Sequence, residues 1–326
     1  MQAIAYSSYG PPEVLRPVTL PRPEPKPGEV LVRIHATSVT SGDYRARSLD
    51  MPPGFGPVGR LVFGLFRPRR QVLGTEFSGV VEAVGSDVTR FAPGDRVFAY
   101  PGATFGGYAD HAVIAETAAI AHAPENLGLD EAATIPFGGA TALSFLRDKA
   151  GIKPGDRVLV IGAAGSVGSA AIQLGKAFGA DVTGTASPAK LDMVLGLGAD
   201  RVIDHKQEDP AAAPGAYDII LDTSGTATYA RYAAALKPGG QLLLVSANLW
   251  QLLATLFARK TGGRKAYGGY APERAEDLRF LADLAASGRF RPFIDKRFPL
   301  DQAAAAHRYF QSPARKGNVV ITLDPA

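Results

Sequence analysis

The sequence predicts an α/β protein in which a Rossmann-type, doubly wound parallel sheet domain is inserted in a discontinuous β-rich barrel domain. Three observations lead to this prediction. Short strands with Pro/Gly turns come first, a glycine-rich turn follows near the middle, and strand-like segments return near the end. The 326 residues suit two domains better than one. We expect the barrel domain at 1–124 and 289–326, and the parallel sheet domain at 125–288.

The first part of the chain has the pattern of antiparallel β structure. Glu29–Ser38 alternates apolar and polar residues, as a half-buried strand does. Phe77–Val84 and Arg96–Ala99 continue this pattern, and a Pro-Gly-Asp sequence at 93–95 marks the turn between them. Many short strands joined by such turns are typical of a barrel.

The stretch 157–187 carries the strongest functional signal. A continuous apolar strand at 158–161 leads into three glycines and then an amphipathic helix. Glycines permit a tight turn, close approach of the backbone to a phosphate, and close packing of helix on strand, while the helix N-terminus attracts the anion. An ordinary loop is the alternative, but the strand-turn-helix context favours dinucleotide binding. The residues predicted to bind the cofactor here are Gly162, Ala163, Gly165, Ser166, Val167 and Gly168.

The choice of dinucleotide depends on the residues about twenty positions after the first glycine. The window 182–187 contains no acidic residue that could hold the ribose hydroxyls of NAD. Ser187 and Lys190 instead offer a hydroxyl and a cation, which suit a 2′-phosphate. The sequence therefore predicts NADPH in preference to NADH. The alternative is that Lys190 is a solvated surface lysine.

The chain after the glycine-rich turn alternates between strands and helices. Short strands are expected at 200–204, Tyr217–Asp222 and 241–246, with helical stretches between them. Strand-like sequences at 292–300 and 317–323 then return the chain to the first domain. This return makes the first domain discontinuous.

Composition excludes several classes of function. The chain has no cysteine, which rules out disulfides and thiolate metal sites. The net charge is +4, but the basic residues are scattered and no nucleic-acid motif accompanies them, so no nucleic-acid partner is expected. The N-terminal sequence lacks the pattern of a signal peptide, and a cytoplasmic location is the expectation.

Weak motifs occur together along the whole chain, in a specific order. They are AIAYSSYGPPEVL, GTEFSGVVEAVGSDVTRFAPGDRVFA, GGYADHAVI, GGATALSFL, the glycine-rich turn, LGADRVIDHKQED, YDIILDTSG, LKPGG and KGNVVI. In this order the chain resembles the medium-chain dehydrogenase/reductase superfamily, and within it the zinc-free branch of quinone-oxidoreductase-like proteins. The resemblance implies that the barrel domain is GroES-like.

The chain departs from the zinc-dependent members of that superfamily at the metal ligands. The positions that match those ligands hold Thr40, Thr75 and Phe137. None of these is a normal zinc ligand, because zinc requires thiolate, imidazole or carboxylate. The sequence therefore predicts no metal site and no zinc.

The resemblance implies a zinc-independent, NADPH-dependent oxidoreductase that reduces a quinone or an α,β-unsaturated carbonyl by hydride transfer. Such a small, hydrophobic, electrophilic substrate needs no metal, because its product anion is delocalised. Two alternatives stay open. One is an NADPH-binding structural or regulatory protein with little turnover, and the other is alcohol or aldehyde dehydrogenase activity.

The proton that completes such a reduction has candidate donors in the sequence TSGDY. Tyr44 has a phenol that could donate a proton, while Thr40 and Ser41 could hydrogen-bond the substrate oxygen. A buried Tyr44 with a purely structural hydroxyl is the alternative, and water is another proton source. Asp43 and Glu76 match acids found in the family and are expected to have structural roles.

Further residues are predicted to contact the cofactor. Ser246 and Asn248 follow the fifth strand, at the carboxyl edge where open α/β sheets bind ligands. The resemblance adds Thr141, His205, Lys316 and Asn318. His205 stands where relatives have a tyrosine, so a surface histidine is its alternative. The resemblance also implies a homodimer.

Two apolar segments with basic ends distinguish this chain from many quinone reductases. They are 49–70 and 249–265, and the second contains the only tryptophan, Trp250. One hypothesis is that they meet over the nicotinamide as a wall for a hydrophobic substrate. A second is a weak contact with an anionic membrane, and a third is a subunit interface or additional core.

Overall fold

The computed structural model describes residues 1–258 and 263–323. Residues 259–262 of the predicted segment 249–265 therefore lie outside the described residues. The chain divides into two compact units. The β-rich unit comprises Met1–Met51, Gly56–Ala140 and Glu273–Ala326. The parallel-sheet unit comprises Pro52–Phe55 and Thr141–Pro272.

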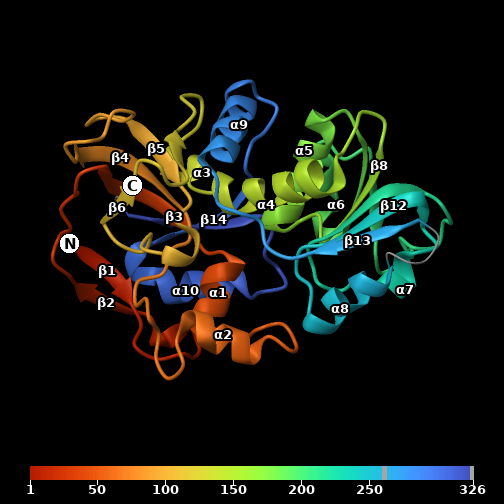
Figure 1. Cartoon of the computed structure of the whole chain (residues 1–326), viewed down its shortest axis with the longest axis horizontal. Helices are drawn as coiled ribbons and strands as arrows, with labels where there is room; N and C mark the ends of the chain where they lie inside the picture. Colours follow the sequence, from red (N-terminus) through yellow and green to blue (C-terminus); the bar gives the residue numbers. More distant parts are fainter. Residues whose placement is uncertain (259–262, 324–326) are drawn as a thin grey trace. The chain divides into compact units, whose positions relative to one another are not determined.

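The parallel-sheet unit has the Rossmann-type, doubly wound topology that the sequence predicts. All pairs of neighbouring strands run parallel, in the order β10-β9-β8-β11-β12-β13. Helices α5 and α6 cover one face of the sheet and α7 and α8 the other (Figure 1). The strands are β8 (Arg157–Ile161), β9 (Asp181–Ala186), β10 (Arg201–Asp204), β11 (Tyr217–Asp222), β12 (Leu236–Leu244) and β13 (Lys265–Gly268). The helices are α4 (Thr141–Leu143), α5 (Ser166–Ala177), α6 (Leu191–Gly196), α7 (Tyr229–Tyr232) and α8 (Leu249–Ala258).

The fifth strand of this sheet differs from its predicted bounds of 241–246. Strand β12 begins at Leu236 and ends at Leu244, where it pairs with Asp222, the last residue of β11. Pairing stops there because β11 provides no further partner. The sixth strand, β13, has no counterpart in the sequence prediction; it pairs in parallel with the end of β12.

The β-rich unit is built around a sheet in the order β14-β15-β3-β4-β5-β7, with β6 also paired to β3. Strands β1 and β2 form a separate antiparallel pair. The strands are β1 (Gln2–Ala5), β2 (Arg16–Thr19), β3 (Glu29–Ser38), β4 (Phe77–Val84), β5 (Arg96–Ala99), β6 (His111–Ala115), β7 (Ile120–His122), β14 (Ile294–Pro299) and β15 (Asn318–Thr322). The helices are α1 (Ser41–Ser48), α2 (Gly56–Phe63), α3 (Leu129–Ala132), α9 (Ala275–Ala286) and α10 (Ala303–Phe310).

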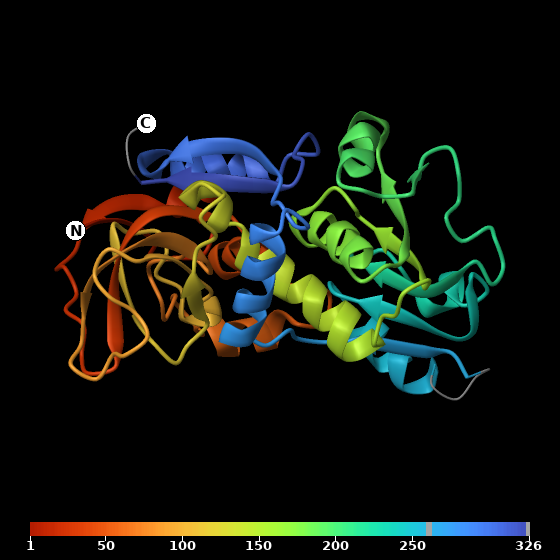
Figure 2. The ribbon, with the colours of Figure 1, turned by 90° about the horizontal axis from the view of Figure 1, so that it is seen from above.

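The β-rich unit is discontinuous, as the sequence predicts. Strand β15 pairs antiparallel with β3, so that Val320 lies opposite Ser38. Figure 2 shows the C-terminal strands, in blue, beside the N-terminal part of the chain, in red. The predicted boundaries assigned 125–140 and 273–288 to the other domain, whereas the structure places both ranges in the β-rich unit. Helix α9 explains this placement, because Asn126 Nδ2 donates to the carbonyl of Ala285 at 2.9 Å.

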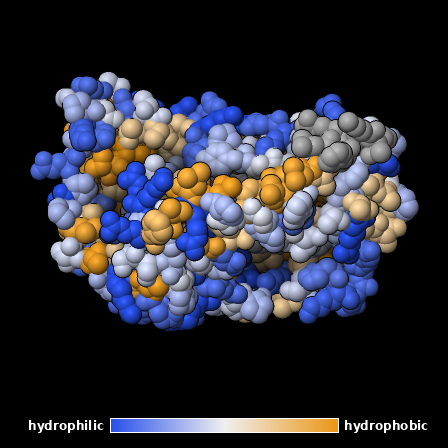
Figure 3. Space-filling view, turned by 60° about the horizontal axis from the view of Figure 1, so that its bottom comes forward, coloured by the Kyte–Doolittle hydropathy of each residue, from blue (hydrophilic) through white to orange (hydrophobic). Residues whose placement is uncertain are grey.

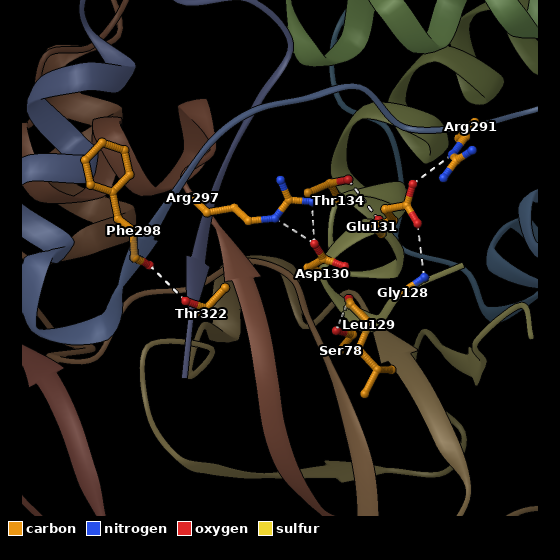
Figure 4. A network of polar contacts seen from close by, with 10 residues as sticks. All are labelled: Ser78, Gly128, Leu129, Asp130, Glu131, Thr134, Arg291, Arg297, Phe298 and Thr322. Atoms are coloured by element: carbon orange, nitrogen blue, oxygen red, sulfur yellow. Dashed lines mark hydrogen bonds and ion pairs between the residues drawn. The ribbon is translucent and has the colours of Figure 1, made fainter. Parts of the chain in front are cut away.

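A polar network joins helix α3 to the returning C-terminal segment (Figure 4). Arg297 Nε donates to Asp130 at 2.7 Å, and Arg291 Nε donates to Glu131 at 2.8 Å. Glu131 also accepts the backbone N–H of Gly128 at 3.0 Å, which caps α3. Both arginines are largely exposed, so these ion pairs fix the register of the segments more than they stabilise the fold.

Candidate functional site

The glycine-rich turn lies at the carboxyl end of β8, in the centre of the parallel sheet. Gly162 has φ +78, in the left-handed region that favours glycine. Its N–H donates to Thr185 Oγ1 at 3.3 Å, and the N–H of Ala163 donates to the Thr185 carbonyl at 3.1 Å. Strand β9 therefore holds the turn in place through Thr185.

Gly168 is required by the packing of the fold, whereas the absence of a side chain at Gly165 leaves space for a ligand. A Cβ on Gly168 would lie 2.2 Å from the carbonyl oxygen of Gly162, so this position must be glycine for helix α5 to pack against the turn. A Cβ on Gly165 would lie 3.6 Å from the same oxygen, an ordinary contact. The fold thus tolerates a side chain at Gly165. The space above Gly165 is available for a ligand that approaches the backbone closely.

The N-terminus of α5 offers uncapped amide groups beside that space. Gly165 is the N-cap residue and supplies no side-chain cap, and the first intrahelical bond runs from Ser169 N to Gly165 O at 2.8 Å. The N–H groups of Ser166, Val167 and Gly168 precede that bond and point out of the helix end. This arrangement fits the pyrophosphate of a dinucleotide.

The adjacent strand β11 ends in a loop that sequence analysis did not assign to the site. Asp222 is fully buried and accepts hydrogen bonds from the backbone N–H groups of Ser224, Gly225 and Ala227. Thr223 Oγ1 lies 2.9 Å from the Ile161 carbonyl, at the start of the glycine-rich turn. In the sequence, the only indication that this loop belongs to the site is its place after a strand, at the carboxyl edge of the sheet.

The structure brings together two residues predicted to bind the adenosine end. Ala186 and Asp204 are paired across β9 and β10, and Ser187 and His205 are the residues that follow them. His205 N–H donates to the Ala186 carbonyl at 3.4 Å, and its side chain is exposed. Lys190 ends the short helical turn that follows Ser187 and is half-buried.

Ser246 and Asn248 follow β12 on the same unit. Ser246 packs against Gly225, since a Cβ on Gly225 would lie 2.7 Å from the Ser246 carbonyl oxygen. Asn248 Oδ1 accepts the N–H of Gln251 at 2.8 Å, and Gln251 Oε1 accepts the N–H of Asn248 at 2.7 Å. Asn248 thus caps the N-terminus of α8 through its side-chain oxygen. Thr141 is buried at the start of α4.

The remaining predicted site residues belong to the β-rich unit, where Thr40 and Asp43 begin helix α1. Asp43 is fully buried, and its carboxylate accepts hydrogen bonds from Thr40 N, Thr40 Oγ1, Gly74 N, Thr75 N and Thr75 Oγ1. Burial raises the pKa of Asp43, and these donors oppose that rise. Asp43 therefore acts as an internal anchor that joins α1 to the loop before β4.

The three positions that match zinc ligands converge on Gly42. A Cβ there would lie 3.1 Å from Thr75 Cγ2, 3.3 Å from Thr40 Oγ1 and 3.9 Å from Phe137 Cε2. The hydroxyls of Thr40 and Thr75 are 2.8 Å apart, and because each has one proton, a hydrogen bond between them takes the place of one of the two that they can donate to Asp43. Among the described residues, no three His, Cys, Asp or Glu side chains gather as metal ligands would. Two threonine hydroxyls and a phenyl ring do not fit zinc.

Glu76 lies behind these positions and is fully buried. Ser38 Oγ hydrogen-bonds Oε1, and the N–H of Phe137 donates to Oε2 at 2.6 Å. Burial raises the pKa of Glu76 to about 8, although these two hydrogen bonds oppose the shift. Glu76 thus links β3 to the 136–140 turn.

Tyr44 and Ser41 lie on helix α1. The Tyr44 hydroxyl donates to the carboxylate of Asp50, and burial followed by this hydrogen bond raises the pKa of Tyr44. Tyr44 is half-buried, so its hydroxyl is fixed by Asp50 without being sealed from solvent. Ser41 is the first residue of the helix and is also half-buried.

A buried chain of hydrogen bonds positions helix α1 from the far side. Arg47 Nε donates to His307 Nδ1 at 3.2 Å, and His307 Nε2 lies 2.9 Å from the Tyr108 hydroxyl. Because Nδ1 is an acceptor, Nε2 carries the proton and donates to Tyr108, which in turn donates to the Ser38 carbonyl at 3.3 Å. Burial, followed by the charge of Arg47, lowers the pKa of His307 to about 3. No sequence pattern indicates this series of hydrogen bonds.

Lys316 and Asn318 lie at the start of β15. The N–H of Lys316 donates to Asp295 at 2.7 Å, and Asn318 Nδ2 donates to the Phe293 carbonyl at 3.1 Å. One hydrogen bond from the Asn318 side chain thus holds β15 beside the preceding segment.

The two apolar segments 49–70 and 249–265 touch each other in the described residues. The N–H of Leu249 donates to the carbonyl of Pro53 at 3.1 Å, and Gly54 packs against the Leu249 side chain. The stretch Pro52–Phe55 accordingly belongs to the parallel-sheet unit. Trp250, next in the chain, is 69% exposed.

Comparisons with known proteins agree with this architecture. Residues 26–125 match the family described as alcohol dehydrogenase GroES-like domain, and residues 197–321 match the family described as zinc-binding dehydrogenase. The chain is 32% identical to a quinone oxidoreductase of Pseudomonas aeruginosa, over 98% of each chain. It is 31% identical to the chloroplast envelope quinone oxidoreductase homolog of Arabidopsis thaliana, over 94% of this chain and 93% of the relative. The solved quinone oxidoreductase of Coxiella burnetii superposes with a TM-score of 0.86 at 30% identity, covering 99% of each chain.

Proposed function

Since the chain belongs to the quinone-oxidoreductase-like branch of the medium-chain dehydrogenase/reductase superfamily, we propose that it is a zinc-independent, NADPH-dependent reductase of quinones or α,β-unsaturated carbonyl compounds. Membership makes it an NAD(P)H-dependent oxidoreductase of the quinone-reductase type. The choice of NADPH, the independence from zinc and the substrate class are the proposal.

One observation carries the cofactor assignment: the glycine-rich turn is flanked by Ser187 and Lys190 rather than by an acidic residue. An acid after β9 would repel a 2′-phosphate, whereas a hydroxyl and an ammonium group can bind it. Ser187 and Lys190 follow the strand that holds the turn through Thr185, so both lie at the edge where the adenosine ribose binds in such sheets.

Replacing Lys190 by alanine is expected to raise the KM for NADPH by roughly tenfold and to leave the KM for NADH unchanged, because only the former carries the 2′-phosphate. Steady-state kinetics with both cofactors measure this. Lys153→Ala, exposed in the loop before β8 of the same unit, is the matched control. An equal loss with both cofactors would assign Lys190 to a structural role instead.

The donors around Gly42 support catalysis without zinc. The hydroxyls of Thr40 and Thr75 hydrogen-bond within a cluster that includes the Asp43 carboxylate, and the three positions that match zinc ligands carry no imidazole, thiolate or carboxylate of their own. NADPH, when bound, supplies the hydride. The residues of the chain must then orient the substrate, exclude water and provide a proton. A delocalised product anion needs no metal to stabilise it, which favours quinones and enones over simple alcohols.

Tyr44 is the proposed proton donor. Burial raises the pKa of Tyr44, so the phenol holds its proton at neutral pH, and the hydroxyl must turn from Asp50 to give that proton to the substrate. We expect Tyr44→Phe to lower kcat by about a hundredfold while the Kd for NADPH stays unchanged. Full activity in this variant would transfer the role to water.

The decisive experiment follows NADPH oxidation against quinones, enones, simple aldehydes and alcohols, with NADH and a chelator in parallel. Turnover of quinones or enones with NADPH, unaffected by chelator, is the expected result. Chelator-sensitive alcohol oxidation would contradict zinc independence. Tight NADPH binding without turnover of any electrophile would instead indicate a binding protein.

A further inference from the structure

Helix α2 presents its apolar side away from the protein. The outward-facing residues recur at helical spacing and continue into the following loop. They are Val58, Leu61, Val62, Leu65 and Phe66, called here the α2 apolar surface, with exposed fractions of 49%, 67%, 51%, 55% and 89%. Figure 3 shows the face on which α2 lies, where orange apolar side chains occur among blue hydrophilic ones. A surface helix normally buries such a stripe.

The inward side of α2 is fixed to the β-rich unit. Gly59 packs on Met51, and the Phe63 ring lies 6.3 Å from the Phe105 ring in the core. The loop after the helix is held as well, since Tyr9 Oη donates to the Gly64 carbonyl at 2.8 Å. The exposed apolar residues therefore belong to a helix whose other side is packed against the β-rich unit. Rotation of the helix to bury them would expose Phe63.

The charged side chains of the segment that carries the α2 apolar surface are all positive. Residues 51–75 contain no Asp or Glu. The stretch does contain exposed arginines at 60, 67, 69 and 70, and none of them forms an ion pair within the described part of the chain. An exposed apolar stripe bordered by arginines that form no ion pair with the described residues is complementary to a lipid bilayer, which is anionic at its surface and apolar beneath.

We propose that the α2 apolar surface and its arginines dock the protein on an anionic lipid bilayer, with the apolar side chains in the interface and the guanidinium groups at the lipid phosphates. Across residues 1–258 and 263–323, every helix is too short or too polar to cross a membrane. Docking of this kind is peripheral and reversible. The arginine contribution is screened by salt.

Co-sedimentation of the full chain with vesicles tests this proposal. We expect binding to phosphatidylcholine vesicles that contain phosphatidylglycerol, little binding to pure phosphatidylcholine, and release by high salt. The pair Leu61→Ser/Phe66→Ser, and separately Arg67→Gln/Arg70→Gln, should each weaken binding by roughly tenfold or more. Leu195→Ser, an exposed leucine on α6, and Arg16→Gln, an exposed arginine on β2, should not.

The absence of cysteine permits a direct measurement of insertion. An environment-sensitive fluorophore on Phe66→Cys should shift to the blue with anionic vesicles, whereas the same label on Leu195→Cys should not. Lack of binding to anionic vesicles, or binding that the α2 variants leave unchanged, would overturn the proposal. So would conversion of a dimer to a monomer by Leu61→Ser/Phe66→Ser in sedimentation velocity, which would identify the partner as a second copy of the chain.

Discussion

Replacing Gly165 by alanine is expected to raise the Kd for NADPH by at least about a hundredfold, which corresponds to roughly 2.7 kcal/mol, while the protein stays folded. The added Cβ would fit the fold, since its nearest neighbour would be the Gly162 carbonyl oxygen at 3.6 Å. It would also occupy the space beside the uncapped amides of α5, where the pyrophosphate must approach the backbone. Isothermal titration with NADPH measures the effect.

Two further glycine variants complete this experiment. Gly168→Ala should reduce the free energy of unfolding by about 3 kcal/mol or more, because its Cβ would overlap the Gly162 carbonyl at 2.2 Å. Gly196→Ala, on α6 with open space around it, should change neither stability nor binding appreciably. Binding of NADPH by Gly165→Ala at the unaltered Kd would mean that the pyrophosphate does not bind at this turn.

Local patterns explain why much of the fold was predictable. Glu29–Ser38, Phe77–Val84 and Tyr217–Asp222 match their predicted bounds, because alternation or a continuous apolar run specifies a strand without help from distant residues. Strand β13 was missed because its sequence, KAYG, is too short to show a period. The start of β12 was missed because it contains Pro-Gly-Gly, which resembles a turn.

The sequence predicted residues of the candidate site only where glycines or charged side chains form a recognisable pattern. Thr185 and Thr223 support the glycine-rich turn, yet as β-branched residues in or after strands they look ordinary in the sequence. The contact between Arg47 and His307 joins residues 260 positions apart, and no local pattern reports it. The hydrogen bond from Asn318 Nδ2 to the Phe293 carbonyl likewise depends on how two segments lie side by side in the folded protein.

Glu76 and His307 are expected to produce opposite arms in the dependence of stability on pH. Burial, with the nearby charge of Asp43, raises the pKa of Glu76 from 4.5 to about 8, although hydrogen bonds from Ser38 and Phe137 oppose the rise. Burial, with the charge of Arg47, lowers the pKa of His307 from 6.5 to about 3. Each group therefore binds a different number of protons in the folded and unfolded states over a window of pH.

The two windows overlap only in part. Between pH 4.5 and 8 the folded protein holds the additional proton, on Glu76, so the free energy of unfolding falls as pH rises. Between pH 3 and 6.5 the unfolded chain holds the additional proton, on His307, so the free energy of unfolding falls as pH decreases. Each slope is about 1.4 kcal/mol per pH unit. They cancel between pH 4.5 and 6.5, and a plateau is expected there.

Urea unfolding from about pH 3 to pH 9 tests both arms. Glu76→Gln should flatten the alkaline arm, because a glutamine amide does not titrate. His307→Gln should flatten the acid arm, because a glutamine amide can still accept from Arg47 and donate to Tyr108 without titrating. His122→Gln, on the surface, should leave both arms in place. An alkaline arm of unaltered slope in Glu76→Gln would show that Glu76 is ionised throughout this range, and that its buried contacts with Ser38 and Phe137 outweigh its desolvation.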